Sequence, residues 1–421
     1  MNFEEIMYKQ PIINICTIGS VSNGKTTLMK ALTGESTAKF HKEKERNMTI
    51  KLGYTSCKIW ECPKCEVFKY HPTSSKKKKS KCPKCCEPAK LVNHISFVDC
   101  PGHHSYLGTM MSGVTVVDGC LLVTDGSKKQ PAQQTIEHLK IATSLDIVKD
   151  NMLVFQNKLD LVSITDACLH LEKIRYLLWE YKIKSAPIVP ISAQSEYNID
   201  AVCEYLMRLK PHKRDITHDL LMQIIRTFDV NKPGCEYEKM TGGVIGGVII
   251  RGMIKIGDEV VIQPGLIKKG GFYTPIKSKV LSIKCGTEKL ETAYPGANVG
   301  LSLTIDPFIS KQDRLVGSLV GHKMETMPDC FKECMAPYFP INKYDKLSRK
   351  EDLIVNIGSS RINAIVKAIV RENEIKKLHL ILQRPVCASF YDKFLITQKI
   401  KNEWTVSYVA YVEKIKKLSP S

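Results

Sequence analysis

The 421-residue sequence contains no uninterrupted apolar run long enough to span a membrane. The stretch GGVIGGVII comes nearest in character, and Arg251, Lys255 and Asp258 soon break it. The first ten residues, MNFEEIMYKQ, lack the apolar centre of a secretory signal. We therefore expect a cytoplasmic protein that has no membrane partner.

Acidic residues are in the minority, with 43 Asp and Glu against 62 Lys and Arg, which gives a formal net charge of +19. This imbalance favours a polyanionic partner such as nucleic acid over an acidic small substrate, although a purely solubilising charge remains an alternative. Tandem repeats of fixed period are also absent. The 16 cysteines come without a secretion signal, which indicates a reducing compartment where thiols stay free or bind metal.

Short apolar runs alternate with helical patterns up to about Leu209. Each run is continuous and rich in Ile and Val, as is typical of parallel strands that are buried on both faces. The runs are IINICTI, HISFVDC, GCLLVTD, MLVFQNK and APIVPIS. This alternation predicts a doubly wound α/β domain.

The sequence pattern changes after KPHKR. From there to the end of the chain, short runs rich in strand-forming residues follow one another, separated by Gly and Pro. Two β-barrels are the fold that this pattern favours. We therefore predict an α/β domain over residues 1–210, with an insertion at about 60–88. A second domain over 211–327 and a third over 328–421 are each predicted to be a β-barrel.

The stretch GSVSNGKT, Gly19 to Thr26, follows the first apolar run and fits the phosphate-loop pattern Gly-x-x-x-x-Gly-Lys-Thr. Its glycines allow backbone N–H groups to turn toward phosphate oxygens, and Lys25 can reach the terminal phosphates. The Thr26 hydroxyl can ligate Mg²⁺, and the helix that begins near Lys25 adds its positive dipole end. A bare Gly-rich turn is the alternative, and the companion motifs decide against it.

Three companions follow, each at the carboxyl end of a predicted strand. In DCPGHH, Asp99 can hold the magnesium shell and the Gly102 N–H can sense a γ-phosphate. In NKLD, the Asp160 carboxylate can accept from two guanine N–H groups, a pattern that adenine lacks. SAQ, Ser192 to Gln194, can touch the guanine O6 through a backbone N–H. Four motifs in this order predict a GTPase.

Two CPKC motifs enclose sixteen residues, a spacing typical of a zinc ribbon. We expect Cys62, Cys65, Cys82 and Cys85 to form a closed, structural Zn²⁺ site, with Cys86 as an alternative to Cys85. Between the motifs, SSKKKKSK is either a solvated loop or a contact for RNA phosphate.

The motif DCPGHH resembles the translational GTPases of the elongation factor Tu class, which carry two β-barrels after the GTPase domain. Within that class, ERNMTIKLGY (45–54) and FDVNKPGCE (228–236) are similar to the gamma-subunit family of eukaryotic and archaeal translation initiation factor 2. The class usually shows Gly-His-Val-Asp-His-Gly-Lys in the phosphate loop, with Ala for Asp in the gamma subunit. Here Ser20 stands in place of the first His, Ser22 in place of the Asp or Ala, and Asn23 in place of the second His.

The resemblance implies a set of site residues. His103 matches the position that orients the attacking water, and Thr49 matches the switch threonine, although it would otherwise be only the start of a strand. The implied Mg²⁺ ligands are Thr26, Thr49 and Asp99. The implied GTP-binding residues are Gly19, Val21, Ser22, Asn23, Gly24, Lys25, Thr26, Thr27, Thr49, Gly102, Asn157, Lys158, Asp160, Ser192, Ala193 and Gln194.

The function implied is GTP-dependent binding of initiator methionyl-tRNA and its delivery to the small ribosomal subunit, with GTP hydrolysis triggering release. The implied partners are the alpha and beta subunits of the same heterotrimeric factor, together with GTPase-activating and nucleotide-exchange factors. The aminoacyl end of the tRNA would lie between the second domain and the switches.

Two alternatives to this function stay open. One is a Tu-like carrier of another aminoacyl-tRNA, such as a selenocysteine-specific factor. We expect no appended domain after the second barrel, and this argues against that alternative. The other is a GTP-binding assembly scaffold with little hydrolysis.

Overall fold

The structure is a computed structural model of the chain, and it describes most of the sequence. The described residues are 3–36, 49, 52–103, 107–114, 117–146, 151–183, 185–211, 214–231, 242–268, 271–341, 346–372, 374–400 and 403–420. Most of the stretch 45–54 and the residues after 231 in the stretch 228–236 therefore lie outside the described residues, as does His104.

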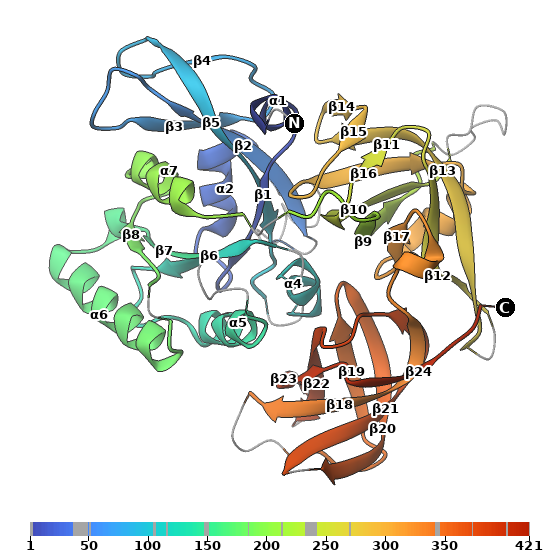
Figure 1. Cartoon of the computed structure of the whole chain (residues 1–421). Helices are drawn as coiled ribbons and strands as arrows, with labels where there is room; N and C mark the ends of the chain where they lie inside the picture. The colour runs from blue at the N-terminus through green and yellow to red at the C-terminus, as the bar shows by residue number, and fades with distance from the viewer. Residues whose placement is uncertain are drawn as a thin grey trace. The chain divides into compact units, whose positions relative to one another are not determined.

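The chain forms two compact units (Figure 1). The first unit comprises residues 1–213 with 286–288 and 296–298, and the second comprises 214–285, 289–295 and 299–421. No helix in the described ranges is long and apolar enough to cross a membrane.

The first unit is built on one sheet with the strand order β3-β2-β5-β1-β6-β7-β8, and β4 also pairs with β5. Strands β5, β1, β6, β7 and β8 run parallel, whereas β2 and β3 are antiparallel additions. The strands are β1 (Ile13–Ile18), β2 (Gly53–Glu61), β3 (Tyr70–Ser74), β4 (Ser80–Lys81), β5 (Pro88–Asp99), β6 (Gly119–Asp125), β7 (Met152–Asn157) and β8 (Ile188–Pro190). The predicted doubly wound domain is confirmed.

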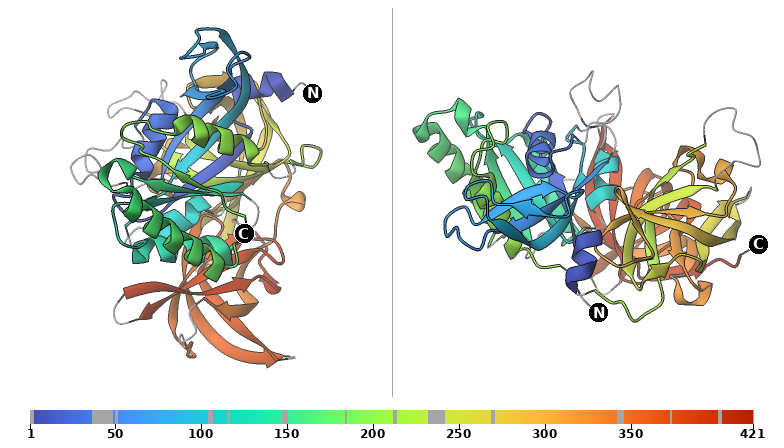
Figure 2. Two further views of the ribbon diagram at one scale, coloured as in Figure 1. Left: turned by 90° about the vertical axis from the view of Figure 1, so that its left-hand side faces the viewer. Right: turned by 90° about the horizontal axis from the view of Figure 1, so that it is seen from above.

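Helices cover both faces of this sheet, with α2 and α7 on one face and α5 and α6 on the other (Figures 1 and 2). Every residue of β1, β6 and β7 is buried, which explains why their sequences are continuous apolar runs. The helices are α1 (Phe3–Lys9), α2 (Lys25–Thr33), α4 (Leu107–Val114), α5 (Gln133–Ser144), α6 (Ile164–Glu180) and α7 (Ile199–Arg208).

The inserted ribbon grows out of the antiparallel edge of the sheet. Strand β2 leads into the first CPKC motif, β3 returns from it, and β4 leads into the second motif before β5 re-enters the sheet. The indole of Trp60 is fully buried and donates a hydrogen bond to the Thr73 hydroxyl at 2.8 Å. The ribbon is therefore an extension of the domain sheet.

The second unit contains two closed six-stranded β-barrels, as predicted. The first barrel follows the order β12-β17-β9-β10-β16-β13 and closes through β12–β13. Its strands are β9 (Leu221–Phe228), β10 (Val244–Arg251), β12 (Glu259–Ile267), β13 (Tyr273–Cys285), β16 (Asn298–Leu303) and β17 (Leu319–Gly321). Short strands flank it, namely β11 (Ile254–Lys255), β14 (Glu288–Leu290) and β15 (Thr292–Ala293).

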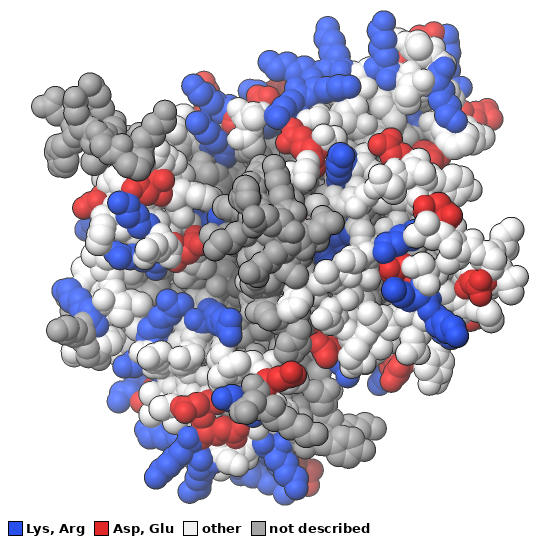
Figure 3. Space-filling view, turned by 180° about the vertical axis from the view of Figure 1, so that it is seen from behind, with Lys and Arg blue, Asp and Glu red and all other residues white. Residues whose placement is uncertain are grey.

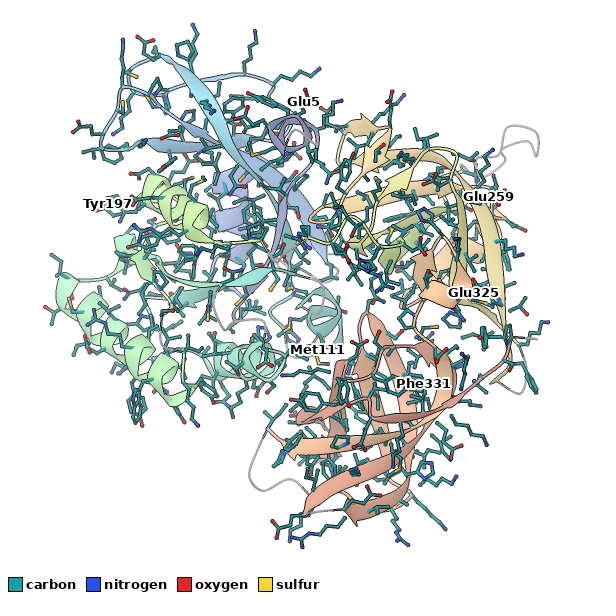
Figure 4. The ribbon with its side chains drawn as sticks, in the orientation of Figure 1. Glu5, Met111, Tyr197, Glu259, Glu325 and Phe331 are labelled. Carbon is teal, nitrogen blue, oxygen red and sulfur yellow. The ribbon has the colours of Figure 1, made fainter. Side chains whose placement is uncertain are left out.

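The second barrel follows the order β21-β20-β19-β22-β23-β18 and closes through β21–β18. Residues of β20 alternate between buried and exposed from Ser360 to Lys367, because a barrel strand turns one face to the core and one to solvent. Phe331, labelled in Figure 4, is fully buried in this core. Its six strands are β18 (Cys330–Pro340), β19 (Asp352–Ile357), β20 (Ser360–Glu372), β21 (Ile375–Cys387), β22 (Lys393–Ile400) and β23 (Glu403–Tyr411). A further strand, β24 (Lys414–Lys417), pairs with β18.

Candidate nucleotide site and metal centre

A cavity of about 720 Å³ lies at the carboxyl ends of the parallel strands of the first unit. Its walls come from the phosphate loop, the segment after β5, and the loops after β7 and β8, which are far apart in sequence. The lining residues are Val21, Ser22, Gly24, Lys25, Thr26, Thr27, Lys30, Ser36, Thr49, Gly102, Asn157, Lys158, Asp160, Leu161, Ser192 and Gln194. All four predicted motifs therefore meet around one space, at the edge where α/β sheets bind ligands.

The phosphate loop needs its glycines for two reasons. Gly19 and Gly24 have φ angles of 137° and 94°, which side-chain-bearing residues rarely adopt. A Cβ on Gly24 would also lie 2.1 Å from the Asn157 Nδ2 atom, and one on Gly102 would lie 2.5 Å from the Lys25 Nζ atom. Close packing thus brings the loop, Asn157 and the segment after β5 into direct contact.

Lys25 is buried and donates hydrogen bonds to the carbonyl oxygens of Gly19 and Ser20, at 2.9 and 2.8 Å. Burial lowers the pKa of Lys25 to about 8, a shift that the nearby Asp99 and Cys100 partly oppose. A buried ammonium at the N-terminus of α2, where the helix dipole is positive, is suited to bind phosphate oxygens.

The replaced side chains of the phosphate loop are held by helix α5. The Ser20 hydroxyl donates to the Gln134 side-chain oxygen at 2.7 Å, and the Ser20 N–H donates to the Thr135 hydroxyl at 3.1 Å. The Asn23 amide donates to the Val123 carbonyl at 2.7 Å and to Thr135 at 3.2 Å. Ser20 and Asn23 therefore anchor the loop, whereas Ser22 lines the cavity.

The three predicted magnesium ligands lie together. The Thr26 hydroxyl donates to Asp99 Oδ2 at 2.8 Å and lies 3.1 Å from the Thr49 hydroxyl. Asp99 is fully buried, and the Thr17 hydroxyl donates to its other carboxylate oxygen at 2.9 Å. An oxygen cluster with one negative charge fits Mg²⁺, a hard cation that prefers oxygen ligands.

The NKLD motif joins two walls of the cavity. The Asn157 amide donates to the Asn23 carbonyl at 2.8 Å, and its side-chain oxygen accepts from the Ala193 N–H at 2.9 Å. The Lys158 ammonium pairs with Asp125 at 2.6 Å. Although burial opposes it, the Lys158 hydrogen bond helps to lower the pKa of Asp125. Asp160 is exposed on the cavity wall, where its carboxylate can face a base.

The SAQ segment is held in a tight loop before α7. The Ser192 and Tyr197 backbones exchange hydrogen bonds of 3.3 and 3.0 Å, which brings the loop back on itself. Tyr197, labelled in Figure 4, ends this loop. Ala193 does not line the cavity, but its N–H fixes the Asn157 side chain.

Several predicted residues lie behind or beside the cavity rather than on its wall. Besides Ala193, they are Gly19, Asn23, Asp99 and His103. Gly19, Asn23 and Asp99 each accept a hydrogen bond from a residue that lines the cavity, namely Lys25, Asn157 and Thr26 respectively. His103 is half-buried and follows Gly102 directly, and the next residues along the chain are outside the described ranges.

Sequence reasoning missed the residues that support the site from a distance. Asp125 is the last residue of β6, and Lys158 directly follows β7. Their ion pair could have been predicted, because the carboxyl ends of neighbouring parallel strands meet at one edge of the sheet. On α5, Thr135 and His138 are three positions apart and both accept from the loop backbone, at Ser20 and Gly19. That spacing was a weak signal. Lys30, Ser36 and Leu161 gave none.

The second site is the cysteine cluster of the ribbon. The sulfur atoms of Cys62, Cys65, Cys82 and Cys85 all lie within 4.8 Å of one another. The Cys62–Cys85 and Cys65–Cys82 sulfur separations are 3.3 and 3.9 Å. A tetrahedron with Zn–S bonds of about 2.3 Å places its sulfurs roughly 3.8 Å apart. The donor set and its size therefore fit Zn²⁺.

Cys86 lies outside this group and has a positive φ angle of 60°. Its N–H donates to the Cys82 carbonyl at 3.0 Å. Backbone N–H groups of Cys85 and Lys84 lower the pKa of Cys82 to about 6, which favours the thiolate that a metal needs. Hydrogen bonding to the Cys62 and Cys85 sulfurs raises the pKa of Cys65 to about 12. A metal binds cysteines as thiolates, so the cation itself would have to offset the negative charge that four neighbouring thiolates bring together.

Three known families match successive parts of the chain. Residues 10–212 match the elongation factor Tu GTP binding domain, and residues 242–312 match elongation factor Tu domain 2. Residues 324–411 match the family described as initiation factor eIF2 gamma, C terminal.

Solved structures with the same fold include the bacterial selenocysteine-specific elongation factor EF-Sec, with a TM-score of 0.72 and 20% identity. The match covers 96% of this chain but only 59% of that one. Translation elongation factor SelB from Methanococcus maripaludis, in complex with the GTP analogue GppNHp, gives a TM-score of 0.71 and 21% identity, with coverage of 97% and 80%. At this identity the likeness concerns the fold alone.

Whole-chain relatives are much closer in sequence. Eukaryotic translation initiation factor 2 subunit 3 of Drosophila melanogaster is 37% identical, over 95% of this chain and 88% of its own length. Eukaryotic translation initiation factor 2 subunit gamma of Encephalitozoon cuniculi is 40% identical, over 95% and 92%. This chain belongs to the gamma-subunit family of eukaryotic translation initiation factor 2.

Proposed function

We propose that this chain binds initiator methionyl-tRNA in its GTP-bound state and delivers it to the small ribosomal subunit, with GTP hydrolysis triggering release. The observation that carries the proposal is the meeting of four GTPase motifs around one cavity, in a chain that aligns with gamma subunits over 95% of its length. The chain is thus a translational GTPase.

In this proposal the phosphate loop, Gly19 and Val21 to Thr27, cradles the phosphates and Lys25 neutralises them. Asp160 reads the guanine, with Asn157 and Lys158 fixing the loop geometry and the 192–194 segment closing the base side. Mg²⁺, when held by Thr26 and Thr49 with Asp99 behind them, supplies charge neutralisation at the phosphates. Thr49 and Gly102 are the groups that would respond to a γ-phosphate.

His103 is proposed to orient the attacking water. Its support is its position directly after Gly102, which lines the cavity beside Lys25. Orientation of water by a single side chain is the usual device of GTPases.

The proposed partners are the alpha and beta subunits of the same factor, a GTPase-activating factor and a nucleotide-exchange factor. The names of the relatives support a multi-subunit factor of translation initiation. The domain boundaries 1–210, 211–327 and 328–421, and zinc as the metal of the ribbon, belong to the same proposal.

The cargo is tested by comparing three tRNAs at physiological salt, with GTP and Mg²⁺ and with the alpha and beta subunits supplied. Methionylated initiator tRNA should bind more tightly than uncharged initiator tRNA and than a methionylated elongator tRNA. Equal affinity for all three would remove the initiator-carrier function. Single-turnover hydrolysis that no ribosomal partner accelerates would instead favour a GTP-binding scaffold with little hydrolysis. The reason to consider this alternative is the replacement of phosphate-loop residues at Ser20, Ser22 and Asn23.

A further inference from the structure

The ribbon carries a concentration of positive charge that the nucleotide site does not use. Residues 60–90 contain nine lysines and three glutamates. Lys and Arg side chains crowd the upper edge of the face drawn in Figure 3, the end of the first unit at which Figure 1 labels β3 and β4. Such a surface attracts a polyanion.

Acidic neighbours compensate only part of this charge. Lys64 pairs with Glu87, Lys69 with Glu61, and Lys76 with Glu35. By contrast, we find no ion pair within the described part of the chain for the four exposed lysines that we call the ribbon tip. The ribbon tip is Lys77, Lys78, Lys79 and Lys81.

The backbone of the ribbon tip is fixed at its two ends, at Lys77 and at Lys81. The ammonium group of the buried Lys58 donates to the Lys77 carbonyl at 3.1 Å, and the Lys77 N–H donates to the Ser74 carbonyl at 3.1 Å. Lys81 pairs in register with Pro88 of β5. Because both ends of the ribbon tip are held, ordering its backbone around a ligand costs less entropy than ordering a loop with free ends.

Elsewhere in the ribbon, an exposed aromatic ring lies beside Lys84, a lysine that is not part of the ribbon tip. Phe68 is 44% exposed, and the Lys84 ammonium lies 3.0 Å from the centre of its ring. Lysines combined with an exposed aromatic ring are typical of surfaces that bind nucleic acid, where the cations meet phosphates and the ring can stack on a base.

We propose that the ribbon tip binds the phosphate backbone of RNA, independently of the nucleotide state of the GTPase site. The choice of RNA over another polyanion rests on the proposed function, in which the chain works among tRNA and ribosomal RNA. Four lysine ammonium groups bind phosphates as point charges, so the contact carries no sequence preference.

The test uses the full chain with Lys77, Lys78, Lys79 and Lys81 all changed to Gln. A matched control changes four exposed lysines elsewhere in the first unit, Lys9, Lys128, Lys129 and Lys210, so both variants lose the same charge. Zinc content and GTP affinity are measured first, and both should equal those of the parent chain. Binding is then followed against salt concentration for three probes, namely initiator tRNA, purified small ribosomal subunits and phosphatidylserine vesicles.

The ribbon-tip variant should bind at least one of the two RNA probes about 10-fold or more weakly at low salt, with a log–log salt slope shallower by up to about 3–4. The control should change far less. Loss on tRNA alone assigns the contact to the tRNA backbone, and loss on ribosomal subunits alone assigns it to ribosomal RNA. The same loss should appear with GTP and with GDP, so a failure of the nucleotide-gated cargo function would not mask it.

Equal losses for the two variants would overturn the proposal, because bulk charge would then account for the effect. Unchanged RNA binding would overturn it as well. So would a loss confined to phosphatidylserine vesicles, which would make the ribbon tip a surface for anionic lipid.

Discussion

The ammonium group of Lys25 is the buried cation of the phosphate loop, and its titration reports on phosphate binding. Burial lowers its pKa to about 8, below the ordinary value of 10.5. A bound phosphate favours the charged form and raises the pKa again. Free protein above pH 8 therefore has a neutral Lys25 that must take up a proton when nucleotide binds.

Through Lys25, GDP binding should accordingly take up about half a proton at pH 8 and about three quarters at pH 8.5, but almost none at pH 6.5. Affinity should fall as the pH rises through this window. Calorimetry in two buffers of different ionisation enthalpy measures the uptake. Zero uptake at pH 8.5, with affinity retained, would show that Lys25 does not meet the phosphates.

Asp160 is the residue that we hold responsible for the choice of base. Asp160→Asn should weaken GTP binding by about 100-fold or more and improve binding of xanthosine triphosphate, because the amide donates where the carboxylate accepted. Fluorescent-nucleotide competition measures both affinities. Asp166→Asn, the same change in the first turn of α6, is the control and should alter neither. Full GTP affinity in Asp160→Asn would mean that the guanine site is wrongly assigned.

The phosphate loop shows where residue-by-residue prediction stops. Gly19, Gly24, Lys25 and Thr26 could be assigned from their chemistry, because the pattern of turn, cation and hydroxyl is local. The roles of Ser20 and Asn23 could not, because their partners on α5 lie more than 100 positions away. Only the folded chain brings them together.

At the scale of elements, the parallel strands and their order of motifs were predictable because fully buried strands are continuous apolar runs. The antiparallel edge was not, since the ribbon residues separate β2 in sequence from β5, its partner in the sheet. The spacing of the CPKC motifs predicted the cysteine cluster, whereas the anchoring of the lysine turn by Lys58 depends on a buried contact that no local pattern marks.

The ribbon should hold one metal ion without being needed for nucleotide binding. Purified protein should carry about one zinc per chain, and Cys65→Ser should lose it, because a closed structural site uses four ligands. GTP affinity should stay within about twofold, since the four sulfurs are not among the residues that line the nucleotide cavity. Elemental analysis and nucleotide titration measure the two quantities.

The control for this prediction is Cys86→Ser, which should keep its zinc because Cys86 is not among the four clustered cysteines. Full zinc content in Cys65→Ser would point to other ligands. Loss of zinc in Cys86→Ser together with retention in Cys85→Ser would make Cys86 the fourth ligand.

At the scale of the whole molecule, the chain combines a GTPase unit with a unit of two barrels, each of which matches a family of translation factors. The fold itself is shared with elongation factors at about 20% identity, so it does not decide the cargo. The assignment of initiator tRNA as cargo rests on the relatives, which are gamma subunits of initiation factor 2. The proposal of a GTP-dependent switch rests on the residues of the nucleotide cavity. Thr49 and Gly102 both line the nucleotide cavity, and we propose that a γ-phosphate bound there alters their contacts.

The central claim is that GTP controls the binding of initiator tRNA. The most direct measurement is the ratio of the dissociation constants for methionylated initiator tRNA with GDP and with a non-hydrolysable GTP analogue, at physiological salt and with the partner subunits present. Coupling between two sites is typically worth about 1–3 kcal/mol, so the account predicts binding roughly 5- to 150-fold tighter with the GTP analogue. A ratio of one, with both nucleotides shown to be bound, would contradict it.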